Sequence, residues 1–156
     1  MRTLHRGKND TNIGMTEESE RRTDVPTRAH EVDAGLDLYS PIDVLLGWPG
    51  SKTGNSVCID TGVHVEIPKG YVGFLKSKSG LNVKYGLLSE GVIDSGYTGS
   101  IVVKLYNHGD ATVFIQRGQK ISQLVLLPII TPDLELVDSL EETERGDGGF
   151  GSTGAF

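Results

Sequence analysis

The sequence has one cysteine, Cys58, in 156 residues, so an internal disulfide framework is excluded. A lone cysteine is typical of a reducing compartment, and we expect a cytoplasmic protein, or one in the host cytoplasm if a virus encodes it. No apolar run approaches the roughly 18 residues that a membrane span needs, and the polar start predicts no signal peptide. The formal net charge of −6 argues against nucleic acid as a partner. These absences leave a small anion as a possible ligand, provided that cations gather in one cleft.

The chain divides by composition into three parts. Residues 1–24 are dense in charge and show neither a period of two nor one of 3.6, so we expect a polar, mobile leader. Residues 25–138 carry short apolar segments, and a chain of this length is sufficient for one buried core. Residues 139–156 are rich in glycine and are expected to form a flexible arm.

Short segments with a period of two predict an all-β fold. In residues 57–67 alternate side chains are apolar or small, while Cys58, Asp60 and His64 point the other way, which predicts a half-buried strand. Turn residues separate the other expected strands, which are 71–76, 85–88, 91–93, 100–106, 112–116, 121–127 and 134–138. This spacing predicts a β-sandwich or barrel.

Little else is expected between these strands. Residues 41–56 are predicted to form a long loop around one apolar stretch. Helical turns are expected only near residues 139–144 and, as one short turn, following Ser79.

The final RGDGGFGSTG segment has the chemistry of a phosphate and base clamp. Arg145 offers a permanently charged fork for phosphate, and Phe150 offers a face on which a base can stack. Ser152 and Thr153 add hydroxyl donors, while the glycines, Gly151 among them, allow backbone N–H groups to approach an anion. A disordered polar tail is the alternative.

Five segments combine small and polar residues in a way that strand packing does not explain. They are AGLDLYS at 34–40, SKSGL at 77–81, GVIDSGYTG at 91–99, RGQKISQL at 117–124 and RGDGGFGSTG at 145–154. In content, order and approximate spacing they resemble the five motifs of the trimeric dUTP diphosphatase (dUTPase) family. The resemblance implies a jelly-roll β-sandwich or barrel, a homotrimer, a C-terminal arm that closes over the active site, and Mg²⁺ as cofactor. It also implies hydrolysis of dUTP to dUMP and pyrophosphate, which limits uracil incorporation into DNA and supplies dUMP for dTMP synthesis.

Asp94 is the predicted catalytic residue. Because Asp94-Ser95-Gly96 has turn chemistry, we expect the carboxylate at the tip of a hairpin, where it can accept a proton from water. The resemblance implies that this carboxylate is the general base that orients the attacking water on the α-phosphate. Taken from the residues alone, an aspartate that serves only the backbone of its own turn is the alternative.

The same segment holds the residues that are expected to recognise the nucleoside. The resemblance implies that main-chain groups of Gly91, Val92 and Ile93 read the uracil edge. It also implies that Tyr97 packs under the deoxyribose and excludes a ribose hydroxyl by a clash. A strand aromatic that packs on a neighbour is the alternative for Tyr97.

Two further segments are expected around the phosphates. Ser79 and Gly80 can donate a hydroxyl and N–H groups to a triphosphate, although a plain turn is the alternative. Lys78 stands where the family has arginine, so the positive charge is kept but the planar fork is lost. Gln123 matches the family's glutamine near the phosphates, and its alternative is a polar residue on the outer face of its strand.

Asp37 matches a family residue that supports the metal and phosphate region indirectly, and a salt-bridged structural aspartate is the alternative. The resemblance implies that the three phosphates and water hold Mg²⁺, as expected of a hard cation that dehydrates reluctantly. No His, Cys and Asp cluster with metal-ligand spacing occurs in the sequence, so we expect no direct protein ligand.

Two alternatives use the same fold. The dCTP deaminase family places a glutamate in the strand after the third motif, where this chain has Lys104, and it lacks the glycine-rich arm. A nucleotide-binding regulator that acts through a protein partner, as some phage-encoded family members do, is the second alternative. The sequence keeps every catalytic residue type, which argues for turnover. It departs from the family at residues 1–24, where the usual short apolar strand is not recognisable.

Overall fold

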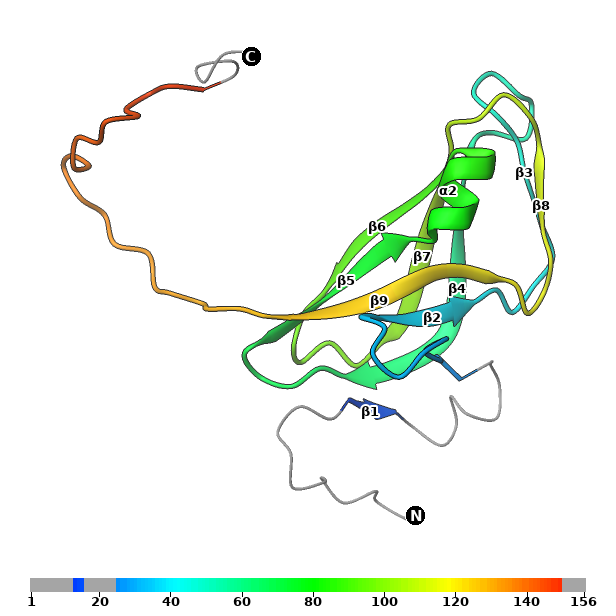
Figure 1. The fold of residues 1–156 in the computed structure, drawn as a ribbon, viewed down its shortest axis with the longest axis horizontal. Helices are drawn as coiled ribbons and strands as arrows, with labels where there is room; N and C mark the ends of the chain where they lie inside the picture. The colour runs from blue at the N-terminus through cyan, green and yellow to red at the C-terminus, as the bar shows by residue number, and fades with distance from the viewer. Residues whose placement is uncertain (1–12, 16–24, 150–156) are drawn as a thin grey trace.

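The computed structural model describes residues 13–15 and 25–149 (Figure 1). In this part of the chain one short helix accompanies a series of strands. The elements are β1 (Gly14–Met15), β2 (Gly35–Tyr39), β3 (Val44–Leu46), β4 (Ser56–Glu66), β5 (Tyr71–Ser77), α2 (Ser79–Tyr85), β6 (Leu87–Ile93), β7 (Ser100–Asn107), β8 (Val113–Ile115) and β9 (Lys120–Pro128).

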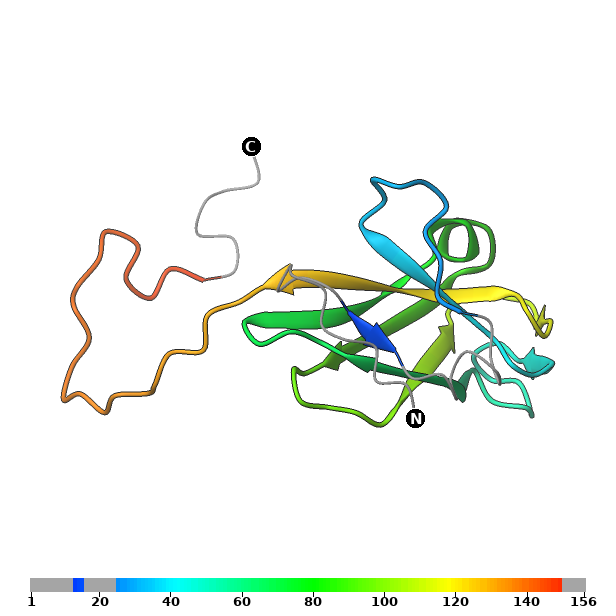
Figure 2. The same ribbon diagram turned by 90° about the horizontal axis from the view of Figure 1, so that it is seen from below.

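Antiparallel pairing joins all of these strands. Seven of them form one sheet in the order β1-β4-β7-β6-β5-β9-β2, and β3 pairs with β8 in a separate two-stranded sheet. Figures 1 and 2 show that the large sheet curls around the interior instead of lying flat. The predicted all-β sandwich or barrel is therefore confirmed.

Alternation of buried and less buried residues along β4, β6 and β7 builds much of the core. On β4, Ile59, Thr61 and Val63 are buried, while Cys58 and Asp60 on either side of Ile59 are exposed, as the pattern in residues 57–67 predicts. The buried cluster contains apolar side chains from the strands β2 to β9 and from α2, and they meet inside the curled sheet. This one-sided burial leaves the ends and the convex side of the sheet for binding.

The segment after β5 differs from the prediction. The expected single helical turn is a helix of seven residues that ends at Gly86, whose left-handed backbone (φ 67°) closes it with an N–H bond to Asn82 O of 2.8 Å. The expected strands 85–88 and 91–93 are one strand, β6. Ser89 in its middle is polar but fully buried, because its hydroxyl bonds to the Ser122 hydroxyl at 2.9 Å.

The tail also differs from the prediction. The main-chain N–H of Ile129 donates to Gly70 O at 2.8 Å, and from Ile130 to Gly149 the described residues hydrogen-bond only to one another. The strand expected at 134–138 and the helical turns expected near 139–144 are wrong. A strand needs a neighbour for its N–H and C=O groups, and this part of the chain runs away from its own barrel (Figures 1 and 2).

Two further expectations need correction. The loop expected at 41–56 contains β3, because Val44–Leu46 pair with Val113–Ile115. The leader contains β1, which pairs with Glu66 and Val65 of β4. A short N-terminal strand therefore exists, although the sequence of residues 1–24 did not predict one.

Candidate active site

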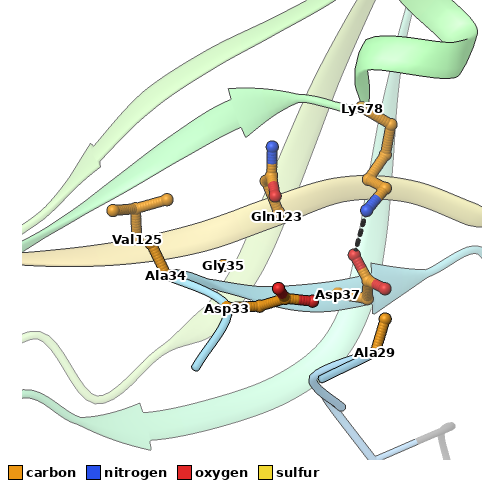
Figure 3. A pocket seen from close by; sticks show the side chains of 8 residues that line it. All are labelled: Ala29, Asp33, Ala34, Gly35, Asp37, Lys78, Gln123 and Val125. Atoms are coloured by element: carbon orange, nitrogen blue, oxygen red, sulfur yellow. Dashed lines mark hydrogen bonds and ion pairs between the residues drawn. The ribbon is translucent and has the colours of Figure 1, made fainter. Parts of the chain in front are cut away.

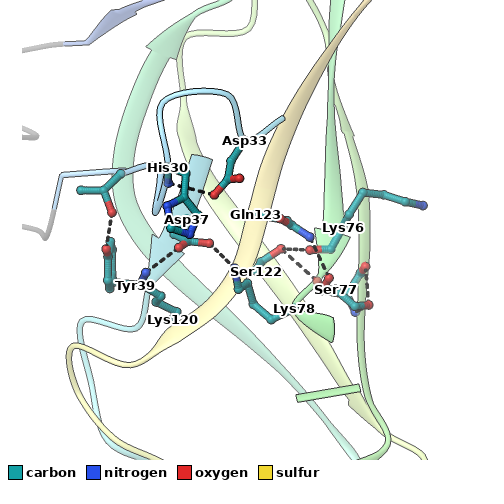
Figure 4. Close-up of polar contacts among 12 residues, drawn as sticks. His30, Asp33, Asp37, Tyr39, Lys76, Ser77, Lys78, Lys120, Ser122 and Gln123 are labelled. Carbon is teal, nitrogen blue, oxygen red and sulfur yellow. Dashed lines mark hydrogen bonds and ion pairs between the residues drawn. The ribbon is translucent and has the colours of Figure 1, made fainter. Parts of the chain in front are cut away.

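The buried carboxylate of Asp37 lies between two lysine side chains (Figure 4). Asp37 belongs to β2 and is only 2% exposed. Lys78 Nζ, just after β5, donates to Oδ1, and Lys120 Nζ, at the start of β9, donates to Oδ2 at 2.7 Å. Of the two interpretations of Asp37, the ion pair is observed, and a role toward phosphates stays a prediction.

The two lysines also set the charge state of this cluster. Burial by itself would raise the pKa of Asp37, but the hydrogen bonds and charges of Lys120 and Lys78 outweigh it and lower the pKa below its usual 3.8. The hydrogen bond to Asp37 raises the pKa of Lys120 above 10.5. At neutral pH the charges of Lys78 and Lys120 are balanced by those of Asp37 and the nearby Asp33, whose carboxylate also raises the pKa of Lys120. Each ammonium group has three N–H donors and gives one to Asp37, so donors remain for an anion nearby.

We expect Asp37→Asn to destabilise the fold most at neutral pH. Since the pKa of Asp37 is lower in the folded chain than its usual 3.8, its stabilising effect is present above that pH and is lost as the pH falls through the folded value. At pH 7 the variant should lose about 2 kcal/mol of unfolding free energy, because two partly exposed lysines remain without their buried partner. Urea unfolding at pH 7 and below pH 3.8, with the exposed Asp110→Asn as control, measures this. A deficit that is independent of pH would contradict the role of the ion pair.

A pocket of about 260 Å³ opens beside the cluster (Figure 3). Its polar lining residues are Asp33, Asp37, Lys78 and Gln123, and its other lining residues are Ala29, Ala34, Gly35 and Val125. Gln123 Nε2 donates to Ser77 O at 3.1 Å, which fixes the amide at the edge of the pocket. Gly35 gives the amide its room, because a Cβ there would lie 2.3 Å from Gln123 Oε1.

Ser79 and Gly80 are exposed at the start of α2, directly after Lys78. A Cβ built on Gly80 would meet nothing within 4 Å, so open space adjoins its backbone. The structure therefore brings the first, second and fourth motifs together through the pairing of β2, β9 and β5.

Asp94 lies elsewhere, at the tip of the β6–β7 hairpin. The N–H of Tyr97 donates to Asp94 O at 3.1 Å, which closes a β-turn, and Gly96 adopts a φ of 93° that favours glycine. The predicted turn is confirmed, and the Asp94 side chain is exposed to solvent.

One chain does not bring Asp94 and Lys78 together. Ile93 pairs with Gly73 near the beginning of β5, while Lys78 follows the end of β5. Five residues of extended chain therefore separate the two sites, which corresponds to roughly 16 Å at about 3.3 Å per residue. Groups this far apart cannot act on neighbouring atoms of one phosphate chain.

The main chain of β6 is incompletely paired next to Asp94. Gly91, Val92 and Ile93 pair with β5, but the ladder between β6 and β7 ends at Ser89 and Leu105. Within the described strands, the β7-facing side of these three residues has no ladder partner. Free N–H and C=O groups at this position can bind the polar edge of a base.

The arm is only partly described. Arg145 is exposed, and its Nε donates to Gly148 O at 2.9 Å within the tail. The predicted residues Phe150, Gly151, Ser152 and Thr153 lie outside the described residues. Leu134 and Leu136 are fully exposed, so the tail as it stands buries almost none of its apolar surface.

Lys120 is one of several cations in or beside the motifs, and the sequence assigned it no role in the site. It belongs to the RGQKISQL segment, but nothing local to that segment indicates a partner. Strand pairing supplies the partner, because β9 lies beside β2 and brings Lys120 opposite Tyr39, two residues from Asp37. In the sequence, only its positive charge within a motif indicated that Lys120 could belong to the site.

The described residues contain no group of three His, Cys, Asp or Glu side chains that could hold a metal ion. Both oxygens of Asp37 already accept hydrogen bonds from lysines. A metal ion at this site would therefore take its ligands from other groups, such as phosphates and water. In the same part of the chain, no helix has the length and apolar character needed to cross a membrane.

Comparison with known proteins finds one family throughout. The dUTPase family model matches residues 21–154. The deoxyuridine 5'-triphosphate nucleotidohydrolase of Clostridium tetani is 40% identical over 133 residues, which cover 83% of this chain and 88% of that protein. The protein of the same name from Paramecium bursaria Chlorella virus 1 is 42% identical over 130 residues, covering 83% and 89%.

Solved structures agree with the sequence comparison. The dUTPase of Staphylococcus bacteriophage 80alpha with dUpNHpp superposes with a TM-score of 0.80 at 31% identity, covering 92% of this chain and 98% of that chain. A mutant dUTPase from phage phi11 of S. aureus, described with a structural Mg(II) ion, has a TM-score of 0.73 at 32% identity, covering 84% and 99%.

Proposed function

The chain belongs to the dUTPase family, and from this premise we propose that it hydrolyses dUTP to dUMP and pyrophosphate. The observation that carries the proposal is the pair of half-sites on one chain: a pocket into which Lys78 brings an ammonium group, and an exposed carboxylate on a hairpin tip at Asp94. The first suits a phosphate chain and the second suits activation of water.

Asp94 acts as the general base. Its carboxylate accepts a proton from a bound water, whose oxygen then bonds to the α-phosphorus while the bond from that phosphorus to the bridging oxygen of the β-phosphate breaks. Pyrophosphate leaves and dUMP remains. The exposed position of Asp94 at a turn supports this role, because the carboxylate can reach solvent and a ligand together.

The hairpin also selects the nucleoside. Main-chain groups of Gly91, Val92 and Ile93 bind the uracil edge, and the early end of the β6–β7 ladder supports this. Tyr97 packs against the deoxyribose and leaves no room for a 2′-hydroxyl.

The phosphates lie against the pocket of the second and fourth motifs. Lys78 supplies charge, Ser79 and Gly80 supply donors beside open space, and Gln123 supplies its fixed amide. Mg²⁺, when bound, offsets the negative charge of the phosphates and polarises the α-phosphorus. The phosphates and water would hold it, and Asp37 would contribute only by keeping the two lysines in place.

The complete site requires several chains, and we assign a homotrimer. The separation between Lys78 and Asp94 supports an arrangement in which Asp94 serves the pocket of a neighbour. Exposed apolar residues on the convex face of β6 and β7 also support assembly, namely Leu88, Val92, Val102 and Tyr106. The arm, with Arg145, Phe150, Gly151, Ser152 and Thr153, closes over the site of another chain.

The single cysteine supports a reducing compartment. Cys58 is free and exposed on β4, a state that is stable where thiols remain reduced. We therefore assign the protein to the cytoplasm, or to the host cytoplasm if a virus encodes it.

Pyrophosphate release by the full chain with Mg²⁺ tests the proposal, using dUTP, dCTP, dTTP and UTP in parallel. We expect release from dUTP alone. Ammonia release from dCTP would indicate a deaminase, although Lys104 lies over the Tyr106 ring at 5.5 Å where that family has its glutamate. Tight binding of dUTP without release would indicate a regulator.

We expect Lys78→Arg to leave kcat/KM for dUTP unchanged or to raise it. Arginine keeps the charge that Asp37 binds and adds the planar fork that fits a phosphate. Lys78→Met serves as the matched control, and it should lower kcat/KM about tenfold or more through loss of the charge. A large loss in the arginine variant, measured by steady-state kinetics, would mean that the pocket is shaped for lysine.

A further inference from the structure

An irregular segment of β4 lies directly behind the Asp94 hairpin. Asp60 pairs with Val102 and His64 pairs with Ser100, so four steps along β4 correspond to two steps along β7. β4 therefore holds two extra residues here, which form a bulge that includes Gly62 at a φ of 69°. Bulges of this kind redirect side chains, and they are common next to functional sites.

Polar side chains in and beside this bulge form hydrogen bonds with the start of β7 and with the residues just before it. Ser100 Oγ donates to Asp60 Oδ1, which also accepts the N–H of Gly62 at 3.0 Å. His64 Nδ1 lies 2.8 Å from Thr98 O, and the buried Thr61 hydroxyl donates to Ile101 O at 2.7 Å. Three successive contacts therefore fix the backbone from residue 98 to residue 101.

Asp60 is adapted to this task. The hydrogen bond from Ser100, followed by that from Gly62, lowers the pKa of Asp60 below its usual 3.8. The carboxylate is therefore ionised at neutral pH, and its bonds to Ser100 and Gly62 are charge-assisted.

Tyr97 rests on the segment that is fixed in this way. Its hydroxyl donates to Ser100 O at 2.9 Å, and its ring lies over Gly99. A Cβ on Gly99 would lie 2.4 Å from the hydroxyl and 2.6 Å from Cζ, so only glycine leaves the ring in this position. The ring has no other hydrogen bond among the described residues.

We propose that Asp60 and Gly99 are positioning residues for Tyr97, and that they thereby determine discrimination between deoxyribose and ribose nucleotides. Asp60 acts through Ser100, whose carbonyl accepts the hydrogen bond of the Tyr97 hydroxyl. Gly99 acts through its lack of a side chain, which leaves space for the Tyr97 ring. The inference rests on the proposed role of Tyr97, and it adds two specificity-determining residues outside the nucleotide contacts.

The test measures binding, so that it does not depend on turnover. Calorimetry compares the imido analogue of dUTP with that of UTP on the full-length protein, with Mg²⁺ present. In Asp60→Ala the preference for the deoxy analogue should fall about tenfold, the size expected for loss of one charge-assisted hydrogen bond that positions the ring. Asp60→Asn keeps an acceptor for Ser100 and should retain most of the preference.

Two further variants separate positioning from stability. Gly99→Ala should lower the preference in the same direction without touching Asp60, because the new Cβ moves the ring. Glu66→Gln, an exposed carboxylate on the same strand, should leave the preference unchanged. Loss of thermal stability with an unchanged preference in Asp60→Ala and Gly99→Ala would overturn the inference. Absence of dUTP hydrolysis by the wild type would instead contradict the proposed function, while the binding ratios would still decide this inference.

Discussion

Asp94→Asn is expected to abolish hydrolysis of dUTP while leaving nucleotide binding nearly intact. The amide cannot accept the proton of the attacking water, so kcat should fall by at least the ~10²–10⁴-fold that a general base contributes. Binding of a non-hydrolysable dUTP analogue should stay within about tenfold, because Asp94 contacts water more than the base or the phosphates. Single-turnover kinetics and calorimetry on the same preparation measure the two quantities.

The matched control for this variant is Asp110→Asn. Asp110 is also an exposed aspartate, but it lies in the loop between β7 and β8. It should retain wild-type turnover. Near-normal turnover by the Asp94 variant would contradict the assignment of Asp94 as the general base. Equal loss of binding and turnover would indicate that the substitution damages the hairpin.

Mixing two inactive chains is expected to restore activity. One chain ends before Arg145 and so lacks the arm, and the other carries Asp94→Asn. If Asp94 and the arm that complete one site come from different chains, random mixing in equal amounts leaves half of the sites with an intact Asp94 and half of those with an intact arm. About a quarter of wild-type activity should therefore return after refolding the mixture.

A second mixture checks the geometry. A chain with both changes is refolded with the wild type in equal amounts, and about a quarter of the sites should again be complete if the arm acts on another chain, but about half if it acts on its own. Mass spectrometry of the intact assemblies verifies the mixing. Mixed trimers without recovered activity in the first experiment would overturn the arrangement, as would activity of the truncated chain alone.

Local patterns in the sequence predicted some elements correctly. The alternation in residues 57–67 predicted β4, and the turn chemistry at Asp94-Ser95-Gly96 predicted the hairpin tip. Both depend on preferences of adjacent residues, so the sequence states them directly. The five motifs likewise identified the family before any contact was known.

Predictions failed where the structure of a segment depends on a pairing partner that is distant in the sequence. The apolar alternation in residues 134–138 resembles a strand, yet among the described residues no strand pairs with it and its side chains stay exposed. Gly14–Met15, within a leader dense in charge, forms a strand because β4 offers it an edge and the core accepts Met15. Ser89 interrupted the expected pattern of β6, but a buried hydroxyl of Ser122 makes it compatible with the core.

The sequence by itself determined the family and the residues that we propose for the chemistry: the aspartate on a turn, the cation in SKSGL and the glycine-rich arm. Only the tertiary structure decided that Lys78 and Lys120 share the buried Asp37, and that Lys78 and Asp94 lie at opposite ends of the β5–β6 pair. The physical reason is that strand register controls which distant residues meet. Asp37 and Lys78 are 41 residues apart, and only the order β5-β9-β2 brings their side chains into contact.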